Sequence, residues 1–377
     1  MFLAHNARMT SNKITFPCWV IGLMSGTSAD GVDAALLYTD GREIIEVGPA
    51  LSESYSDTLR NSILGLMKGQ GVLKEIEREL TDVHLEAIET LRARHKEPIG
   101  LIGFHGQTIR HAPKQGITQQ IGDAKRMAKT TGIPVIADFR SNDVRQGGQG
   151  APLVPLFHAV LAKKLEKPVM VVNIGGVANV TWIGGPRSST SEPPRSDLNI
   201  LAFDCGPGNA LIDDWVGIHT NDRFDKEGHM ASYGKADAKL LAKFLADPFF
   251  SAPAPKSLDR HHFNLGMVAG LSPEDGAATL TAMTAGAIAK ACELVPEAPK
   301  QLLIAGGGRH NPTMMVMISS YARIKAVPVE DVDWYGDMVE AQAFAYLAAR
   351  SFQGLALSLP TTTGVARPVT GGVFYPA

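Results

Sequence analysis

Residues 20–38, Val20-Ile-Gly-Leu-Met-Ser-Gly-Thr-Ser-Ala-Asp-Gly-Val-Asp-Ala-Ala-Leu-Leu-Tyr38, contain the pattern that decides the fold. Two apolar strands flank a turn rich in glycine, hydroxyl residues and aspartate. Gly26 and Gly31 allow a tight turn and a close backbone approach to a ligand, and successive turn amides can form a concavity for anions. An ordinary Asp-Gly hairpin has the same local signature. This segment alone therefore leaves both interpretations open.

A second copy of the pattern favours the phosphate-binding interpretation. Residues 169–183, Val-Met-Val-Val-Asn-Ile-Gly-Gly-Val-Ala-Asn-Val-Thr-Trp-Ile, again place a glycine turn, Gly175-Gly176, between two apolar strands. A third strand is predicted after each pair, at 43–47 and at 200–203, and helical patterns follow. This duplication predicts an α/β protein of two similar lobes with mixed sheets around a central cleft. Each lobe would direct one glycine hairpin at the same phosphates.

A third glycine cluster, Gly306-Gly307-Gly308, ends the predicted strand 302–305 and offers bare backbone to a nucleoside. The common nucleotide motifs G-x-x-x-x-G-K-[ST] and G-x-G-x-x-G do not occur, which argues against a P-loop or Rossmann protein. A nucleotide would therefore be bound by the two hairpins and this cluster.

The composition is that of a globular protein with about two domains. The chain has 377 residues, of which 45% are hydrophobic and 20% charged, with a formal net charge of -2. This balance gives no electrostatic case for nucleic acid or a membrane surface, and no apolar run has the roughly 18 residues that a membrane helix needs. The three cysteines are widely spaced and form no metal or disulfide pattern, which favours the cytoplasm.

We predict a first lobe at 17–145 and 352–377, a second lobe at 146–351, and a frayed tail at 1–16. The segment 184–197 is predicted as a surface loop. The predicted helices are 59–94, 124–131, 152–164, 209–217, 277–294 and 337–352.

Two carboxylates are candidates for acid–base chemistry. Asp204, in Phe203-Asp-Cys-Gly-Pro-Gly-Asn209, is predicted at the end of an apolar strand, before a glycine turn and a helix that Asn209 can cap. A carboxylate there is placed for a general base, but it can equally accept hydrogen bonds from its own turn amides. Glu340, in the last helix, would assist Asp204 or lie on the surface as most helix glutamates do.

The segment Phe104-His-Gly-Gln-Thr-Ile-Arg-His111 follows a predicted strand and gathers polar donors in one turn. This density predicts contacts with a polyhydroxylated or acidic small molecule, and the Arg110 fork suits a carboxylate. The candidate substrate residues are His105, Gln107, Thr108 and Arg110. No metal ligand is assigned, because the histidines lack partners at metal-ligand spacing. In the loop 137–152, Asp138, Arg140 and Asp143 either bind ligand or pair with one another.

Six motifs resemble, in the same order, those of the anhydro-N-acetylmuramic acid kinase family, and the resemblance extends from Val20 to Pro376. The motifs are Gly22-Leu-Met-Ser-Gly-Thr-Ser-Ala-Asp-Gly-Val-Asp33, Phe104 to His111, Ala137-Asp-Phe-Arg140, Gly147-Gly-Gln-Gly-Ala-Pro-Leu-Val-Pro155, Asn173-Ile-Gly-Gly176 and Phe203 to Asn209. The family belongs to the actin, hexokinase and heat-shock chaperone ATPase superfamily, which implies the actin-like (ribonuclease H-like) fold with two lobes.

The resemblance implies a bacterial enzyme of cell-wall recycling that uses ATP and Mg²⁺. It would open the 1,6-anhydro ring of 1,6-anhydro-N-acetylmuramic acid and phosphorylate O6, with Asp204 as the base. It would act as a cytoplasmic homodimer. The implied ATP-binding residues are Gly26, Thr27, Ser28, Ala29, Asp30, Gly31, Val32 and Asp33, with Asn173, Gly175, Gly176, Gly306, Gly307 and Gly308.

Two residues depart from the family or superfamily pattern. Ala29 stands where the family has a larger apolar residue and should point away from the phosphates, and Asn173 stands where the superfamily often has aspartate. Two other readings remain open: a kinase of the same fold for another amino sugar, and a non-catalytic actin-like ATP-binding protein.

Overall fold

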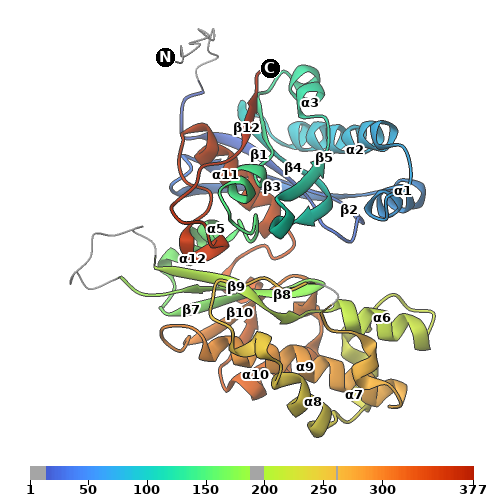
Figure 1. Ribbon diagram of the computed structural model, residues 1–377. Coiled ribbons are helices and arrows are strands. Elements are labelled where there is room, and N and C mark those ends of the chain that lie inside the picture. Colours follow the sequence, from blue (N-terminus) through green and yellow to red (C-terminus); the bar gives the residue numbers. More distant parts are fainter. Residues whose placement is uncertain (1–13, 187–198, 260–261) are drawn as a thin grey trace.

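The computed structural model describes residues 14–186, 199–259 and 262–377. Within these residues the chain forms two mixed sheets, one in each lobe (Figure 1). The first sheet contains β1 (Cys18–Ser25), β2 (Gly31–Thr39), β3 (Ile44–Ser54), β4 (Ile99–Ala112), β5 (Ile117–Ile121), β6 (Val135–Ala137) and β12 (Val373–Tyr375). The second contains β7 (Val169–Ile174), β8 (Val177–Ile183), β9 (Ile200–Pro207), β10 (Gln301–Ala305) and β11 (Ala326–Pro328).

The two sheets repeat one topology. The first has the order β12-β6-β4-β1-β2-β3 and the second β11-β10-β7-β8-β9. In each, three consecutive strands pair antiparallel, and two later strands add in parallel beside the first of them. This confirms the predicted duplication and the two-lobed actin-like fold.

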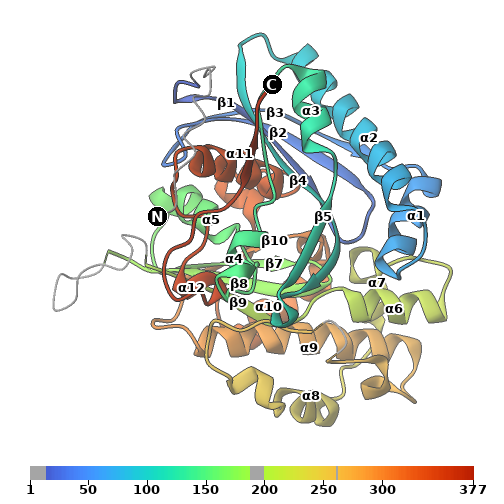
Figure 2. The same ribbon diagram turned by 45° about the horizontal axis from the view of Figure 1, so that its top comes forward.

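Helices cover the faces of both sheets (Figures 1 and 2). They are α1 (Asp57–Met67), α2 (Leu73–Arg94), α3 (Ala124–Thr131), α4 (Ser141–Arg145), α5 (Pro155–Leu161), α6 (Ala210–His219), α7 (His229–Tyr233), α8 (Ala238–Leu245), α9 (Pro273–Glu293), α10 (Pro312–Ala322), α11 (Val339–Phe352) and α12 (Pro360–Thr363). The predicted helix 59–94 is two helices, α1 and α2, since Gly69 and Gly71 between them have positive φ angles.

Helix α11 lies directly on the first sheet because glycines face it. A Cβ atom on Gly22 of β1 would lie 1.8 Å from the Ala341 carbonyl oxygen, and one on Gly103 of β4 would lie 2.2 Å from that of Phe344. Residues 339–351 therefore pack with the first lobe, not with the second as the predicted boundaries had it. Conversely, α12 lies in the segment 352–377 that was expected in the first lobe, but it contacts β9 of the second sheet.

One hydrophobic core joins the lobes. It includes Val20 and Leu101 of the first sheet, Val171 and Leu303 of the second, and the buried face of α11. Ile14 and Phe16 pack against this core, so the predicted frayed tail is wrong for these residues, whereas 1–13 lie outside the described residues. Residues 187–197 of the predicted surface loop also lie outside them.

Candidate active site

The first glycine hairpin forms a tight turn between β1 and β2. The Ala29 amide donates to the Gly26 carbonyl at 3.1 Å, which leaves Thr27 and Ser28 exposed at the tip. Ala29 has a φ of 53° and is fully buried, so its side chain points into the core, as expected for a residue that turns away from phosphate. The Val32 side chain is also buried in that core, and exposed Asp30 pairs with Arg60 at 3.0 Å.

The Gln107 side chain is hydrogen-bonded to this hairpin. Its side-chain nitrogen donates to the Gly26 carbonyl at 2.9 Å, and its oxygen accepts from the Ser25 hydroxyl at 2.6 Å. The Tyr55 hydroxyl lies 2.8 Å from that of Ser25. Gln107 is fully buried, so the structure places this predicted substrate residue against the hairpin backbone.

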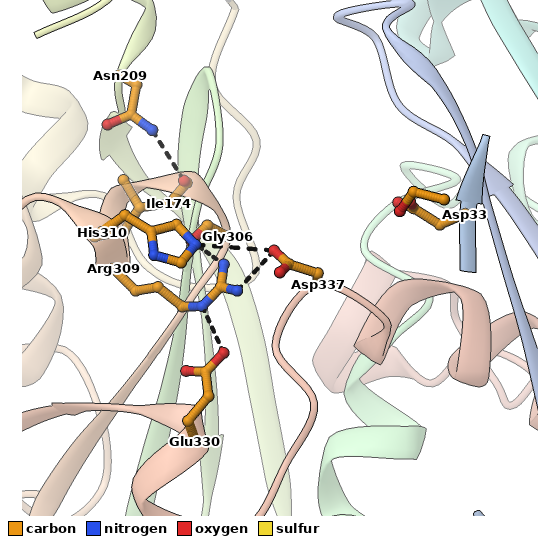
Figure 3. Close-up of polar contacts among 9 residues, drawn as sticks. Asp33, Ile174, Asn209, Gly306, Arg309, His310, Glu330 and Asp337 are labelled. Carbon is orange, nitrogen blue, oxygen red and sulfur yellow. Dashed lines mark hydrogen bonds and ion pairs between the residues drawn. The ribbon is translucent and has the colours of Figure 1, made fainter. Parts of the chain in front are cut away.

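The second hairpin is tied to the start of α6. The Asn209 amide donates to the Gly175 carbonyl at 2.7 Å, and the Gly208 amide to that of Gly176 at 3.0 Å. The Asn209 side chain donates to the Ile174 carbonyl at 3.1 Å and does not cap α6, contrary to our expectation (Figure 3). These bonds fix the glycine turn while Gly176 stays exposed.

The third glycine cluster lies beside Asn173, the last residue but one of β7. Gly306 has a φ of +72°, and a Cβ atom there would lie 2.5 Å from the Asn173 side-chain oxygen. Only glycine fits this position without strain. The Asn173 nitrogen is 3.4 Å from a carboxylate oxygen of Glu340, in the first turn of α11. Gly306, Asn173 and Glu340 therefore form a contiguous set.

Asp204 lies inside β9, not at a strand end. The register between β8 and β9 shifts next to it, because Asn179 pairs with Asp204 and Ala178 with Gly206. Such bulges redirect side chains and occur often beside active sites. One Asp204 carboxylate oxygen accepts the Leu258 amide at 2.8 Å, and burial raises the pKa of this carboxyl to about 6, although the bond to Leu258 lowers it. Its hydrogen-bond donor is thus the amide of Leu258, which is distant in the sequence, and not an amide of its own turn.

A buried polar cluster surrounds Arg140. Its Nε donates to His105 Nε2 at 3.0 Å, and its Nη1 to the Gly150 carbonyl at 2.7 Å. His105 Nδ1 lies 2.7 Å from the Gly106 carbonyl, which assigns the proton to Nδ1 and keeps Nε2 an acceptor. Burial, and then Arg140, lower the pKa of His105 well below its usual value, so the ring is neutral.

Charge interactions link Arg140 to Glu340, and Glu340 to Asp33. Burial raises the pKa of Glu340, the Arg140 charge opposes that rise, and Asp33 adds to it. Burial also raises the pKa of Asp33, Ser52 donates to it at 2.5 Å, and Asp337 is a further cause of the rise. Figure 3 shows Asp33 and Asp337 opposite one another. Asp33 thus interacts electrostatically with both Asp337 and Glu340.

The segment predicted as a polar turn after residue 104 continues β4 as a strand, paired with β5. Figures 1 and 2 show this β4–β5 ribbon reaching toward the second lobe. Thr108 accepts a hydrogen bond from Gln120 at 3.2 Å, whereas Arg110 is exposed.

In the loop after β6, Asp143 accepts hydrogen bonds from the Gly150 amide and the Thr363 hydroxyl, each at 2.6 Å. The loop after β6 is therefore held by hydrogen bonds within itself and to Thr363 of α12.

In the described part of the chain, no group of three or more histidines, cysteines, aspartates or glutamates is arranged to hold a metal ion. None of its helices is long and apolar enough to cross a membrane. Cys18, Cys205 and Cys292 are free thiols.

The duplicated sheets and their glycine turns define a two-lobed protein of the actin-like fold class. Residues 18–377 match the family described as anhydro-N-acetylmuramic acid kinase. The chain is 47% identical over 364 residues to the anhydro-N-acetylmuramic acid kinase of Rhodospirillum rubrum, covering 95% of this chain and 94% of that one. It is 48% identical over 362 residues to that of Acidiphilium cryptum, covering 93% and 96%. The chain belongs to the anhydro-N-acetylmuramic acid kinase family.

Similarity to solved structures is more remote. A gluconate kinase from Lactobacillus acidophilus has a TM-score of 0.47 and 12% identity, covering 95% of this chain and 93% of that one. A ROK family glucokinase from Streptomyces griseus in complex with glucose and AMPPNP has a TM-score of 0.40 and 13% identity, covering 88% and 99%.

Proposed function

We propose that this protein uses ATP to open the 1,6-anhydro ring of 1,6-anhydro-N-acetylmuramic acid and to phosphorylate O6. The products are N-acetylmuramate 6-phosphate and ADP. The observation that carries the proposal is Asp204, a carboxylate with a pKa of about 6 beside a β-bulge, in a chain matched by the family over nearly its whole length. A base with this pKa is ionised at neutral pH and retains proton affinity.

In the proposed reaction Asp204 takes a proton from the attacking water. The water oxygen bonds to the anomeric carbon, and the bond between that carbon and O6 breaks. The freed O6 attacks the γ-phosphorus, and ADP leaves. The Leu258 amide holds one oxygen of Asp204 at 2.8 Å, which leaves the other oxygen for the water.

The two glycine hairpins would bind the ATP phosphates through backbone amides, and the Gly306–Gly308 turn would contact the nucleoside. Asp33 fits a magnesium ion, since Mg²⁺ is commonly held by one or two carboxylates together with substrate phosphates. The charge of a cation would also relieve the repulsion between Asp33 and Asp337. When bound, the ion would neutralise developing phosphate charge.

We place the sugar between the β4–β5 ribbon and the Arg140 cluster. His105 accepts a hydrogen bond from Arg140 at 3.0 Å, and the Arg140 charge opposes the rise in the pKa of Glu340. Thr108 and Arg110 on the ribbon would add contacts to the sugar. Glu340 would assist by orienting polar groups near Asn173.

The test is incubation of the protein with ATP, Mg²⁺ and either 1,6-anhydro-N-acetylmuramic acid or N-acetylglucosamine, with mass detection. We expect a product heavier than the anhydro sugar by one phosphoryl group and one water, and none in the presence of a chelator. Equal or faster phosphorylation of N-acetylglucosamine would favour a kinase for ordinary amino sugars. Nucleotide binding without any sugar product would favour a non-catalytic ATP-binding protein.

We also propose that the protein acts in the cytoplasm as a homodimer. Strand β3 is an edge of the first sheet and exposes Ile45 and Val47, apolar side chains that a second copy would cover. Light scattering on the purified chain measures this directly, and a monomer at micromolar concentration would contradict it.

A further inference from the structure

Arg309 is a buried arginine that lies just behind the third glycine cluster. It belongs to the short 3-10 helix Gly307–His310, and its side chain is 3% exposed. Its guanidinium donates to three acceptors from three parts of the chain (Figure 3). The acceptors are the Gly306 carbonyl at 2.9 Å, Glu330 at 2.9 Å and Asp337 at 2.6 Å.

Two of these acceptors lie on the connection between the lobes. Glu330 is in the 3-10 helix Val329–Val332 that follows β11, and Asp337 comes two residues before α11, which packs on the first sheet. Gly336 lets the connection lie flat on the guanidinium, because a Cβ atom there would lie 2.4 Å from Glu330 and 2.6 Å from Arg309. Arg309 therefore joins the glycine cluster to the segment that enters the first lobe.

The contacts close into a ring. On one side, Arg309 donates to the carbonyl of Gly306, which lies against the Asn173 side chain. The Asn173 side-chain nitrogen is in turn 3.4 Å from a carboxylate oxygen of Glu340. On the other side, Arg309 donates to Asp337, and Glu340 lies three residues after Asp337, in the first turn of α11. Both routes end at the same carboxylate, so the position of Arg309 sets the Gly306 backbone and Glu340 together.

We propose that Arg309 is a positioning residue that couples the nucleotide-facing glycine cluster to Glu340 and to the interlobe connection. This inference rests on the proposed function, because the glycine cluster is taken to bind the nucleoside. A planar guanidinium suits the task since it presents several donors in a fixed fork. A single ammonium on a flexible stem cannot hold three acceptors in one geometry.

The test compares Arg309→Met, Arg309→Lys and Asp337→Asn with a matched control, Arg350→Met. Arg350 also holds several acceptors, the Ala356 and Gly41 carbonyls and the Tyr346 hydroxyl, but from the opposite end of α11. For each variant the Kd of a non-hydrolysable ATP analogue is measured by calorimetry. Steady-state kinetics give kcat and the KM for each substrate, and thermal melts report stability.

We expect Arg309→Met to raise the Kd of the analogue at least about tenfold, the scale of one lost charge-assisted bond. We also expect kcat to fall by up to about 10²-fold, as misplaced groups do, while the KM for the sugar changes less than about twofold. Arg309→Lys should restore part of the loss. Arg350→Met should lower the melting temperature but leave the Kd of the analogue unchanged.

An Arg309→Met variant that only loses stability, as Arg350→Met is expected to, would overturn the proposal. Should Arg309→Met fail to fold, Asp337→Asn decides, since it keeps an acceptor and removes one charge. It should weaken analogue binding severalfold, and binding equal to wild type would overturn the coupling. Absence of sugar turnover by the wild-type protein would instead refute the proposed function, while the binding comparison still tests the coupling.

Discussion

Replacing Asp204 with asparagine should stabilise the protein at neutral pH while it abolishes turnover. Burial raises the pKa of this carboxyl from 3.8 to about 6, so the folded state holds the proton more tightly than the unfolded chain. The resulting stability is fully present below pH 3.8 and is lost as the pH rises through about 6. At pH 7 the ionised carboxylate therefore costs about 3 kcal/mol, from about two pKa units at 1.36 kcal/mol each.

Asparagine keeps the size of the side chain and an oxygen for the Leu258 amide, but it carries no charge to bury. We expect Asp204→Asn to unfold in urea with a free energy up to about 3 kcal/mol higher than wild type at pH 7, with the gap falling to about 1 kcal/mol at pH 4.5. Turnover should fall at least about 10²-fold, in the range of general-base contributions.

The control for this comparison is Asp222→Asn, since Asp222 is an exposed aspartate of the same lobe. Its unfolding free energy should follow that of the wild type at both pH values. An Asp204→Asn protein less stable than wild type at pH 7, or a gap that does not change with pH, would refute the reasoning that Asp204 is ionised in a desolvated site.

The remaining predictions concern catalysis and binding. The kcat/KM for the sugar should rise with pH up to about 6, as Asp204 loses its proton, and a rate independent of pH down to 5 would be inconsistent with this base. Gln107→Leu should raise the KM for ATP because it frees the Gly26 carbonyl, whereas Arg110→Ala should raise the KM for the sugar; the reverse pattern would exchange their sites. A non-hydrolysable ATP analogue should reduce the radius of gyration in small-angle scattering, because each lobe supplies one hairpin, and an unchanged radius would indicate a preformed site.

The sequence predicts the fold well because its decisive signals are local. Each glycine hairpin with its flanking apolar strands is contiguous in the chain, and the third glycine cluster follows an obvious buried strand. The sequence does not predict the extension of β4 beyond Phe104, because its residues are polar and only pairing with β5 holds them in a strand. Likewise, the glycines that seat α11 on the first sheet give no sign of their partner helix in the sequence.

The site is less predictable because its contacts join distant segments. Leu258 lies 54 residues from Asp204 in the chain, and Arg309 lies 28 residues from Asp337. No spacing rule connects such pairs. The sequence indicates only that Arg140 binds ligand or pairs within its own loop, because its bond to His105 depends on how β4 and β6 lie side by side. Polarity predicts that Gln107 contacts the sugar, and in the structure its buried side chain is hydrogen-bonded to the hairpin.

The coupling of ring opening to phosphoryl transfer is tested most directly by mass spectrometry of the reaction in ¹⁸O-labelled water. Preformed product incubated in the same water corrects for exchange at the anomeric carbon. The account predicts one ring opened for each ATP consumed, one ¹⁸O on the anomeric carbon of the sugar and none in its phosphate. Ring opening without ATP, or ¹⁸O in the phosphate, would contradict it.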